Sequence, residues 1–316
     1  MSLLRRGAAR TAALFLSLCA ATALAFSGAA PASAGPGQGR GGEHAMGWYL
    51  ALGDSLAAGY QPGQGDDRKG GYVGDVLGAV RAEAGKTMLR NLSCTGETSV
   101  SMGQGGTCRY PRGSQLDQAV QFLHAHARHT QLVTVTIGAN DVQRCIDAAT
   151  RTVDLACAQQ GLVDVAHNLP VVLSRLRAAA PHTQIVVTNY DNPLLAAWVL
   201  LPGPQGELLA HLSTTVLDQL NATVAAGAAA VGAQVADVST AFSSHDFDPS
   251  HYVTVPGFGS VPLSVARTCQ WTWMCTVPQG PDTHPNDAGY AVIGSTVAAT
   301  VDEGALVPGR RLAPVG

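Results

Sequence analysis

The sequence predicts a three-layer α/β/α protein built on a five-stranded parallel sheet. Between positions 46 and 303, short apolar runs alternate with segments of helical periodicity. This alternation is typical of parallel strands joined by right-handed crossovers, with helices on both faces of the sheet. The chain shows no internal repeat and no second type of composition, so we expect a single domain over 46–303.

The N-terminus has the pattern of a secretion signal. Arg5, Arg6 and Arg10 precede an apolar stretch over 12–26, and Ala32-Ser33-Ala34 follows as a cleavage site of the A-x-A type. We therefore expect a signal peptide over 1–34, a Gly-rich flexible lead-in over 35–45 and a C-terminal tail over 304–316. The expected location is secreted and extracellular.

Charge argues against several classes of partner. The full chain of 316 residues has a formal net charge of −3, and loss of the first 34 residues leaves 16 basic and 22 acidic residues, a charge of −6. No Lys/Arg run remains, which argues against nucleic acid and against anionic membranes. No other apolar stretch is long enough to span a bilayer. We expect a monomer with a small-molecule or lipid substrate and no stable membrane anchor.

The first half of the domain contains three of the expected strands. The apolar run 48–52 stops at Gly53, as a buried strand does before a turn. Helical spacing of apolar residues follows over 73–83 and again over 115–127. The remaining strands of this half are expected at 88–92 and at 131–137, where Val and Thr are frequent.

The second half contains the other two strands, expected at 184–189 and 234–238. A long helix is expected over 162–179, where Pro170 should kink or divide it. The other helices are expected at 208–231 and 287–301, the last with Asn286 as N-cap. Periodicity is lost over 240–277, which predicts a long functional loop.

Six cysteines remain after the signal peptide, and metal binding is not indicated because no C-x-x-C or His/Cys cluster is present. Six cysteines allow fifteen connectivities, and sequence alone cannot choose among them. They fall into three close pairs, and short loops close most readily, so we expect the bonds Cys94–Cys108, Cys145–Cys157 and Cys269–Cys275. Each would stabilise its loop by roughly 2–3 kcal/mol.

Polar clusters follow three of the strands. They are Gly53-Asp54-Ser55, Gly96-Glu97-Thr98 and Gly138-Ala139-Asn140-Asp141, and a fourth, Asp282-Thr283-His284-Pro285-Asn286, lies near the end. The carboxyl ends of parallel strands share one edge of the sheet, so these clusters can meet in one crevice. A serine acts as a nucleophile when an imidazole can take its proton and when donors stabilise the oxyanion that forms.

In order and content, these four blocks resemble those of the GDSL, or SGNH, hydrolases. The resemblance extends from Tyr49 to about Gly294, and it is closest to the secreted actinobacterial (Streptomyces-type) esterases and lipases, which also carry three local disulfides. It implies a flavodoxin-like fold and a serine carboxylesterase or lipase with an acyl-enzyme intermediate and no cofactor or metal.

The resemblance also implies the roles of the site residues. Ser55 would attack the acyl carbon, and His284 would be the base. The oxyanion would be held by the N–H groups of Ser55 and Gly96 and by the side-chain amide of Asn140. Asp54, by its place in the turn, is expected to be a turn or cap residue and not a third catalytic residue. The usual third catalytic residue, an aspartate three positions before the histidine, is replaced here by Pro281. Either Asp282 or a backbone carbonyl would then orient the imidazole, and we favour Asp282.

The substrate is left open. The apolar residues Leu194, Leu195, Trp198, Val199, Leu200 and Leu201 would either accept an acyl chain or begin a core helix. Trp271 and Trp273 would either form a substrate wall or pack in the core. The same scaffold would also suit a phospholipase or a polysaccharide deacetylase, and a catalytically inactive secreted binding protein is the alternative from another class.

Overall fold

The computed structural model describes residues 46–147, 152–201, 203–278 and 280–306. The predicted signal peptide and lead-in, and most of the predicted tail, lie outside these residues. The described residues all belong to one compact unit, 44–316.

A five-stranded parallel sheet forms the centre of the domain, as expected. Its strands are β1 (Gly47–Gly53), β2 (Thr87–Asn91), β3 (Thr130–Thr136), β6 (Gln184–Thr188) and β7 (Gln234–Ala236). They lie in the order β2-β1-β3-β6-β7, and every neighbouring pair is parallel. The order reverses at β1 and β3, and the crevice beyond the carboxyl ends of two such strands is where doubly wound sheets bind ligands.

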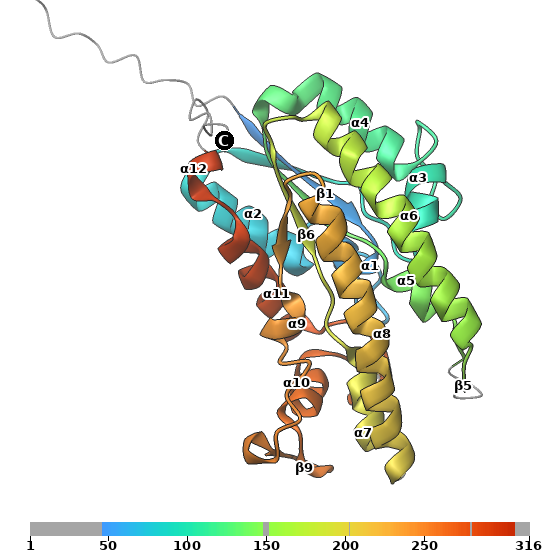
Figure 1. Ribbon diagram of the computed structural model, residues 1–316. Coiled ribbons are helices and arrows are strands. Elements are labelled where there is room, and N and C mark those ends of the chain that lie inside the picture. The colour runs from blue at the N-terminus through green and yellow to red at the C-terminus, as the bar shows by residue number, and fades with distance from the viewer. Residues whose placement is uncertain (1–45, 148–151, 202, 279, 307–316) are drawn as a thin grey trace, which may run out of the picture. The chain divides into compact units, whose positions relative to one another are not determined.

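Helices cover both faces of the sheet (Figure 1). One face packs against α3 (Ser99–Gln104), α4 (Gln115–His126), α6 (Leu155–Ala179) and α8 (Pro204–Ala229), and the other against α2 (Gly71–Ala84), α9 (Val238–Ala241), α11 (Asp287–Thr300) and α12 (Glu303–Leu306). Alternate residues of β1 divide between these two cores, with Leu50 and Leu52 in the first and Tyr49 and Ala51 in the second. Burial of both faces explains the unbroken apolar runs 49–52 in β1 and 185–187 in β6.

Pro170 does not divide the helix, since α6 is continuous over 25 residues, Leu155–Ala179. Val165 and Leu169 before the proline, and Val172 and Leu173 after it, are all buried in the same core, so packing on both sides holds the helix together. It begins at Leu155, one residue after its N-cap Asp154, and not near 162 as expected.

The region 240–277 is not the long loop that its sequence predicts. It contains η3 (Pro249–His251), the hairpin β8 (Val253–Val255) with β9 (Gly259–Val261), and helix α10 (Leu263–Trp271). Each is too short for a periodic pattern to show. A small separate core, which includes Leu195, Val261 and Val265, holds them against the start of α8.

The other short elements are α1 (Ser55–Ala58), η1 (Ala127–His129), α5 (Ala139–Gln143), η2 (Pro193–Ala196), α7 (Ala197–Leu200) and the hairpin β4 (Ile146–Asp147) with β5 (Thr152–Val153). The disulfides Cys94–Cys108, Cys145–Cys157 and Cys269–Cys275 are the three that short loop closure favours. Among the described residues, no helix is both long and apolar enough to span a membrane.

Candidate active site

Ser55 lies at the turn between β1 and α1. Gly53 has a φ of +141°, and a Cβ at this position would lie 2.1 Å from the carbonyl oxygen of Thr136, so only glycine fits. Asp54 caps α1 by accepting a hydrogen bond from the N–H of Leu56 at 3.0 Å, and its own N–H donates to Thr136 O. These bonds fix Ser55, which is buried, at the carboxyl end of β1.

His284 approaches Ser55 from the segment between α10 and α11. Its Nε2 lies 2.7 Å from Ser55 Oγ, and its Nδ1 lies 2.7 Å from Asp282 Oδ1. The same carboxyl oxygen accepts the backbone N–H of His284 at 2.9 Å. The ring of Tyr60 packs against the imidazole with 4.4 Å between centroids. A hydroxyl, an imidazole and a carboxyl group therefore form one hydrogen-bonded chain, and of the two candidates for orienting the ring it is Asp282 that contacts Nδ1.

Asn140 is the second residue of α5, directly after the β3 turn. It lines a small pocket together with Ser55 and His284. One N–H of its side-chain amide donates to the carbonyl of Glu97 at 2.9 Å. Gly96, with a φ of +82°, precedes Glu97 in a turn closed by the bond from Glu97 N to Cys94 O. Gly96 does not itself line the pocket. The hydrogen bond from Asn140 to the next residue, Glu97, connects the Gly96 turn to the pocket.

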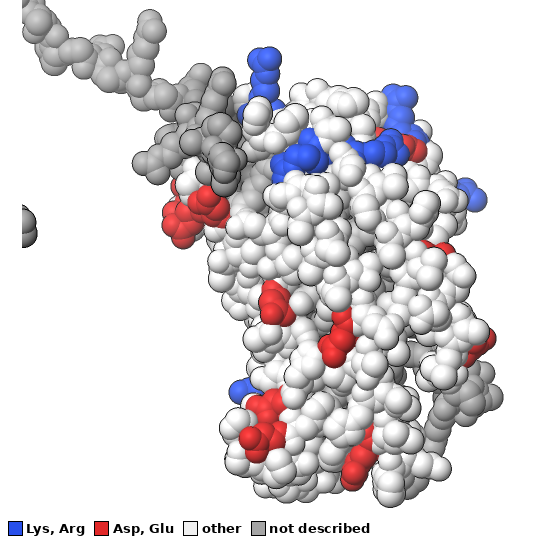
Figure 2. All heavy atoms as spheres, in the orientation of Figure 1, with Lys and Arg blue, Asp and Glu red and all other residues white. Residues whose placement is uncertain are grey.

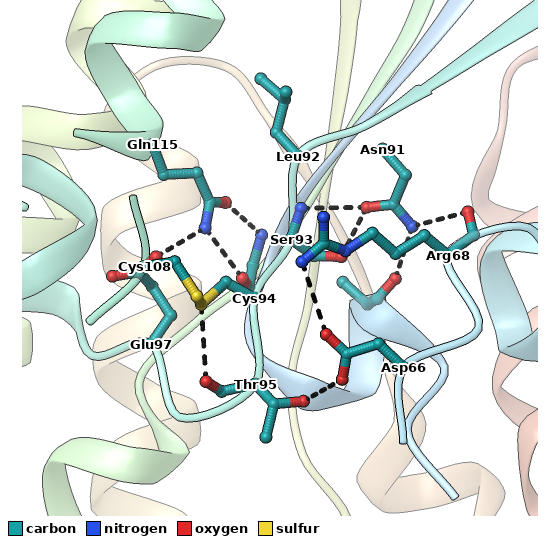
Figure 3. Close-up of polar contacts among 12 residues, drawn as sticks. Asp66, Arg68, Asn91, Leu92, Ser93, Cys94, Thr95, Glu97, Cys108 and Gln115 are labelled. Carbon is teal, nitrogen blue, oxygen red and sulfur yellow. Dashed lines mark hydrogen bonds and ion pairs between the residues drawn. A yellow bond between two sulfur atoms is a disulfide. The ribbon is translucent and has the colours of Figure 1, made fainter. Parts of the chain in front are cut away.

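A buried network behind these residues was not predicted. The side chain of Gln115, at the start of α4, accepts the N–H of Gly53 at 2.7 Å and donates to the carbonyl of Gly53 at 3.0 Å. It also donates to the Glu97 carboxyl at 2.9 Å. Figure 3 shows Gln115 pointing toward Glu97, beside the Cys94–Cys108 disulfide. Gln115 thereby ties the Ser55 turn to the Gly96 turn. Its signal in the sequence is a polar residue on the buried face of a helix.

The loop after β6 adds two further functional candidates that were not predicted from the sequence. The hydroxyl of Tyr190 donates to Asp54 Oδ2 at 2.7 Å. Burial raises the pKa of Asp54 to about 7, although the bonds from Tyr190 and Leu56 oppose this shift. Asp191 follows, and burial raises its pKa to about 7 as well. Tyr190 and Asp191 lie within three residues of the end of β6, so the placement of ligand sites beyond the carboxyl ends of parallel strands applies to them as it does to Ser55 and Asn140.

An apolar cavity adjoins the small pocket and offers about 820 Å³ of empty space, its opening to solvent included. Its walls come from α5, the β4–β5 hairpin, the start of α6, the loop after β6, and α8. Val142, Ile146, Leu212, Val216 and Leu217 are among its apolar lining residues. Such a cavity, beside a reactive hydroxyl, is suited to an aliphatic chain.

Most of the apolar residues that would either accept an acyl chain or begin a core helix lie away from this cavity. Of the group 194–201, only Leu194 lines this cavity. Leu195 is buried in the separate core near α10, and Trp198 and Val199 pack against it. Trp271 packs edge-on against Phe242 at 5.1 Å, and the indole N–H of Trp273 donates to Gln61. Neither tryptophan lines the small pocket or the apolar cavity.

A hydroxyl, an imidazole and a carboxyl group in this order, at the carboxyl edge of a parallel sheet, have the geometry of a serine hydrolase. A sequence model of the GDSL-like lipase/acylhydrolase family matches residues 51–292, and the chain belongs to that family. The family resemblance of the four sequence blocks is thus confirmed.

Solved structures agree on the fold. The extracellular lipase of Streptomyces rimosus has a TM-score of 0.52 at 21% identity, and the alignment covers 81% of this chain and 100% of that one. The lipase Lip_vut3 from a goat rumen metagenome has a TM-score of 0.52 at 16% identity, with 81% and 97% covered. No curated protein matches the chain.

Proposed function

We propose that this protein is a secreted carboxylic ester hydrolase, a lipase or esterase, with Ser55 as nucleophile and His284 as base. The proposal rests on one observation, the pair of 2.7 Å contacts that link Ser55 Oγ to Nε2 of His284 and its Nδ1 to Asp282. Secretion is supported by the N-terminal sequence pattern and by the three disulfides, which form and persist in oxidising compartments.

The proposed reaction has two halves. Ser55 Oγ attacks the acyl carbon while His284 Nε2 takes its proton, and the resulting oxyanion accepts hydrogen bonds from Ser55 N, Gly96 N and the amide of Asn140. The bond to the alcohol then breaks, and the imidazolium gives its proton to the departing oxygen. A water molecule repeats the sequence on the acyl-serine and releases the acid. Asp282 stabilises the imidazolium, and no cofactor is needed.

The apolar cavity favours substrates with acyl chains longer than acetate, because burying each additional methylene contributes about 0.8 kcal/mol to the free energy of binding. This favours a lipase or long-chain esterase over a polysaccharide deacetylase. We further propose that the protein acts as a monomer without a membrane anchor.

Labelling with a fluorophosphonate tests the nucleophile. We expect the wild type to be labelled at Ser55 and to hydrolyse p-nitrophenyl esters from acetate to decanoate, with turnover rising toward the longer chains. Ser55→Ala should lose both labelling and hydrolysis, while Ser264→Ala, at another buried serine, should keep both. Labelling that persists in Ser55→Ala would show that another residue is the nucleophile.

A further inference from the structure

Two neighbouring residues, Tyr60 and Gln61, connect the helix that begins at Ser55 with the segment that carries His284. Tyr60 lies two residues beyond the end of α1. Its backbone N–H donates to the carbonyl of Ser55 at 3.1 Å, and its own carbonyl accepts the hydroxyl of Tyr290, in α11, at 2.9 Å. The backbone of Tyr60 is therefore fixed relative to the proposed nucleophile.

The ring of Tyr60 packs against the imidazole of His284, with 4.4 Å between the ring centroids and 48° between the planes. The two nitrogens of the imidazole are bonded elsewhere, Nε2 to Ser55 and Nδ1 to Asp282. Two bonds of this kind leave the imidazole free to turn about the line that joins them. A ring packed against the imidazole limits that turn.

Gln61 holds the histidine segment at a second point. The oxygen of its side-chain amide accepts the indole N–H of Trp273 at 2.6 Å, and the nitrogen donates to Asp287, at the start of α11, at 3.1 Å. The backbone N–H of Trp273 in turn donates to the carbonyl of His284 at 3.0 Å. Trp273 thereby connects Gln61 to the backbone of His284, which gives a role to a tryptophan that lines neither the small pocket nor the apolar cavity.

These contacts matter because His284 belongs to no helix or strand, whereas Ser55 lies at the turn between β1 and α1. The two residues are 229 positions apart in the sequence. Their separation in space therefore depends on contacts between the two segments. A displacement of about 1 Å between reacting groups can reduce the rate by about 10²-fold.

Tyr60 also suits the charge that His284 acquires in the proposed reaction. The imidazole becomes a cation when it takes the serine proton, and aromatic rings attract cations within about 6 Å of the ring centroid. Among the described residues that line the small pocket, none is Lys or Arg. Figure 2 shows most Lys and Arg of the visible face at the opposite end of the domain, where the strands begin. The imidazolium therefore meets an aromatic ring and a carboxyl group in this pocket, and no Lys or Arg side chain.

We propose that Tyr60 is a positioning residue which, together with Gln61, holds the imidazole of His284 within hydrogen-bonding distance of Ser55. The inference rests on the proposed ester hydrolysis and adds to it two residues that do not line the small pocket. Tyr60 acts on the imidazole itself, and Gln61 acts through Trp273 on the backbone of His284.

The test compares the wild type with Tyr60→Leu, Tyr60→Phe and Gln61→Leu on p-nitrophenyl acetate, an ester too short to depend on the apolar cavity. The measurements are kcat, KM and the second-order rate of labelling by a fluorophosphonate. Low-field proton NMR detects the proton shared by His284 and Asp282, and so reports the orientation of the imidazole. Tyr252→Leu is the matched control, since Tyr252 is another half-buried tyrosine and lies between η3 and β8.

We expect Tyr60→Leu to lower kcat and the labelling rate by about tenfold each with little change in KM, because a displaced reacting group slows the reaction without weakening binding. Tyr60→Phe should retain most of both rates, because it keeps the aromatic ring. Gln61→Leu should lower kcat by about threefold, the value of one hydrogen bond, and Tyr252→Leu should leave it unchanged. The NMR signal should persist in Tyr60→Phe and broaden in Tyr60→Leu.

A kcat for Tyr60→Leu within about twofold of the wild type would overturn the inference, as would an equal loss in Tyr252→Leu or a loss confined to KM. If Tyr60→Leu does not fold, Gln61→Leu decides, and an unchanged kcat in that variant counts against the proposal. These results would leave ester hydrolysis intact. A wild type that neither hydrolyses the ester nor reacts with the fluorophosphonate at Ser55 would instead refute the proposed function.

Discussion

The side-chain amide of Gln115 is bonded to both backbone polar groups of Gly53, accepting its N–H at 2.7 Å and donating to its carbonyl at 3.0 Å. Gly53 is two residues before Ser55, and the same amide reaches Glu97, one residue after Gly96. One side chain therefore sets the distance between the proposed nucleophile and one of its proposed oxyanion donors.

Gln115→Leu should lower kcat by at least about tenfold with little change in KM, because a small displacement of the Ser55 turn weakens contacts made only in the transition state. It should also destabilise the fold by a few kcal/mol, since Gly53 and Glu97 lose buried partners. Steady-state kinetics on a short ester and urea unfolding measure the two effects. Gln118→Leu in the same helix is the control, and an equal loss of kcat in both variants would contradict a positioning role.

Asp282→Ala should reduce kcat by about 10²–10⁴, because the carboxyl group both fixes the tautomer of His284 and stabilises its charged form. Kinetics on p-nitrophenyl butyrate, with His284→Ala for comparison, measure the loss. A loss of only a few-fold, beside a near-complete loss in His284→Ala, would mean that a backbone carbonyl such as that of Pro281 orients the ring.

Asn140→Ala should lower kcat by about 10²–10³ and leave KM for a short ester nearly unchanged, as expected for a donor that acts on the oxyanion. Gln143→Ala, in the same helix α5 and lining the same pocket, should keep most of its kcat. Thermal unfolding of both variants separates catalysis from stability. Similar kcat values for Asn140→Ala and the wild type would remove Asn140 from the oxyanion site.

The double variant Cys145→Ala/Cys157→Ala should lose roughly 2–3 kcal/mol of stability, the value for a loop of this size. It should also lose activity on decanoate more than on acetate, because the bond joins the β4–β5 hairpin to α6 and both line the apolar cavity. The ratio of the two activities is the measurement. Cys269→Ala/Cys275→Ala, away from the cavity, should leave this ratio unchanged, and a change of equal size there would argue against the assignment.

Asp191→Asn should alter how stability depends on pH. Burial raises the pKa of Asp191 to about 7, above the value of about 4 for an unfolded chain, so the folded state holds its proton more tightly between these values. The contribution of this proton to the free energy of unfolding falls as the pH rises from about 4 to about 7, by at most about 1.4 kcal/mol per pH unit. Asp191→Asn lacks this contribution. Urea unfolding at pH 4.5 to 7.5 measures the free energy of unfolding of the wild type and of Asp191→Asn. The value for the wild type should fall relative to that for the variant as the pH rises. Parallel curves would contradict the shift.

The sheet and the positions of Ser55 and Asn140 were predictable because strand ends and glycine turns leave strong local patterns. His284 lies between α10 and α11, and its expected role came from the family resemblance of its sequence block. The residues around them were harder to predict from the sequence. Gln115 acts through a contact 62 positions away in sequence, and Asp191 is distinguished by a missing partner, which a sequence does not display. The helix across Pro170 and the short elements over 240–277 depend on tertiary packing, which overrides local propensity.

Ser55 and Asn140 follow strands of the sheet and His284 lies between α10 and α11, while the walls of the apolar cavity come largely from the β4–β5 hairpin, the start of α6, and α8. Most of the cavity wall therefore comes from segments that do not carry the proposed reacting groups, although Tyr190, Asp191 and Pro193 line both spaces. We expect substitutions in these cavity walls to change the preferred length or bulk of the acyl chain without displacing Ser55 or His284. Replacing the segment 143–158 with that of a relative should therefore change the range of esters that are hydrolysed.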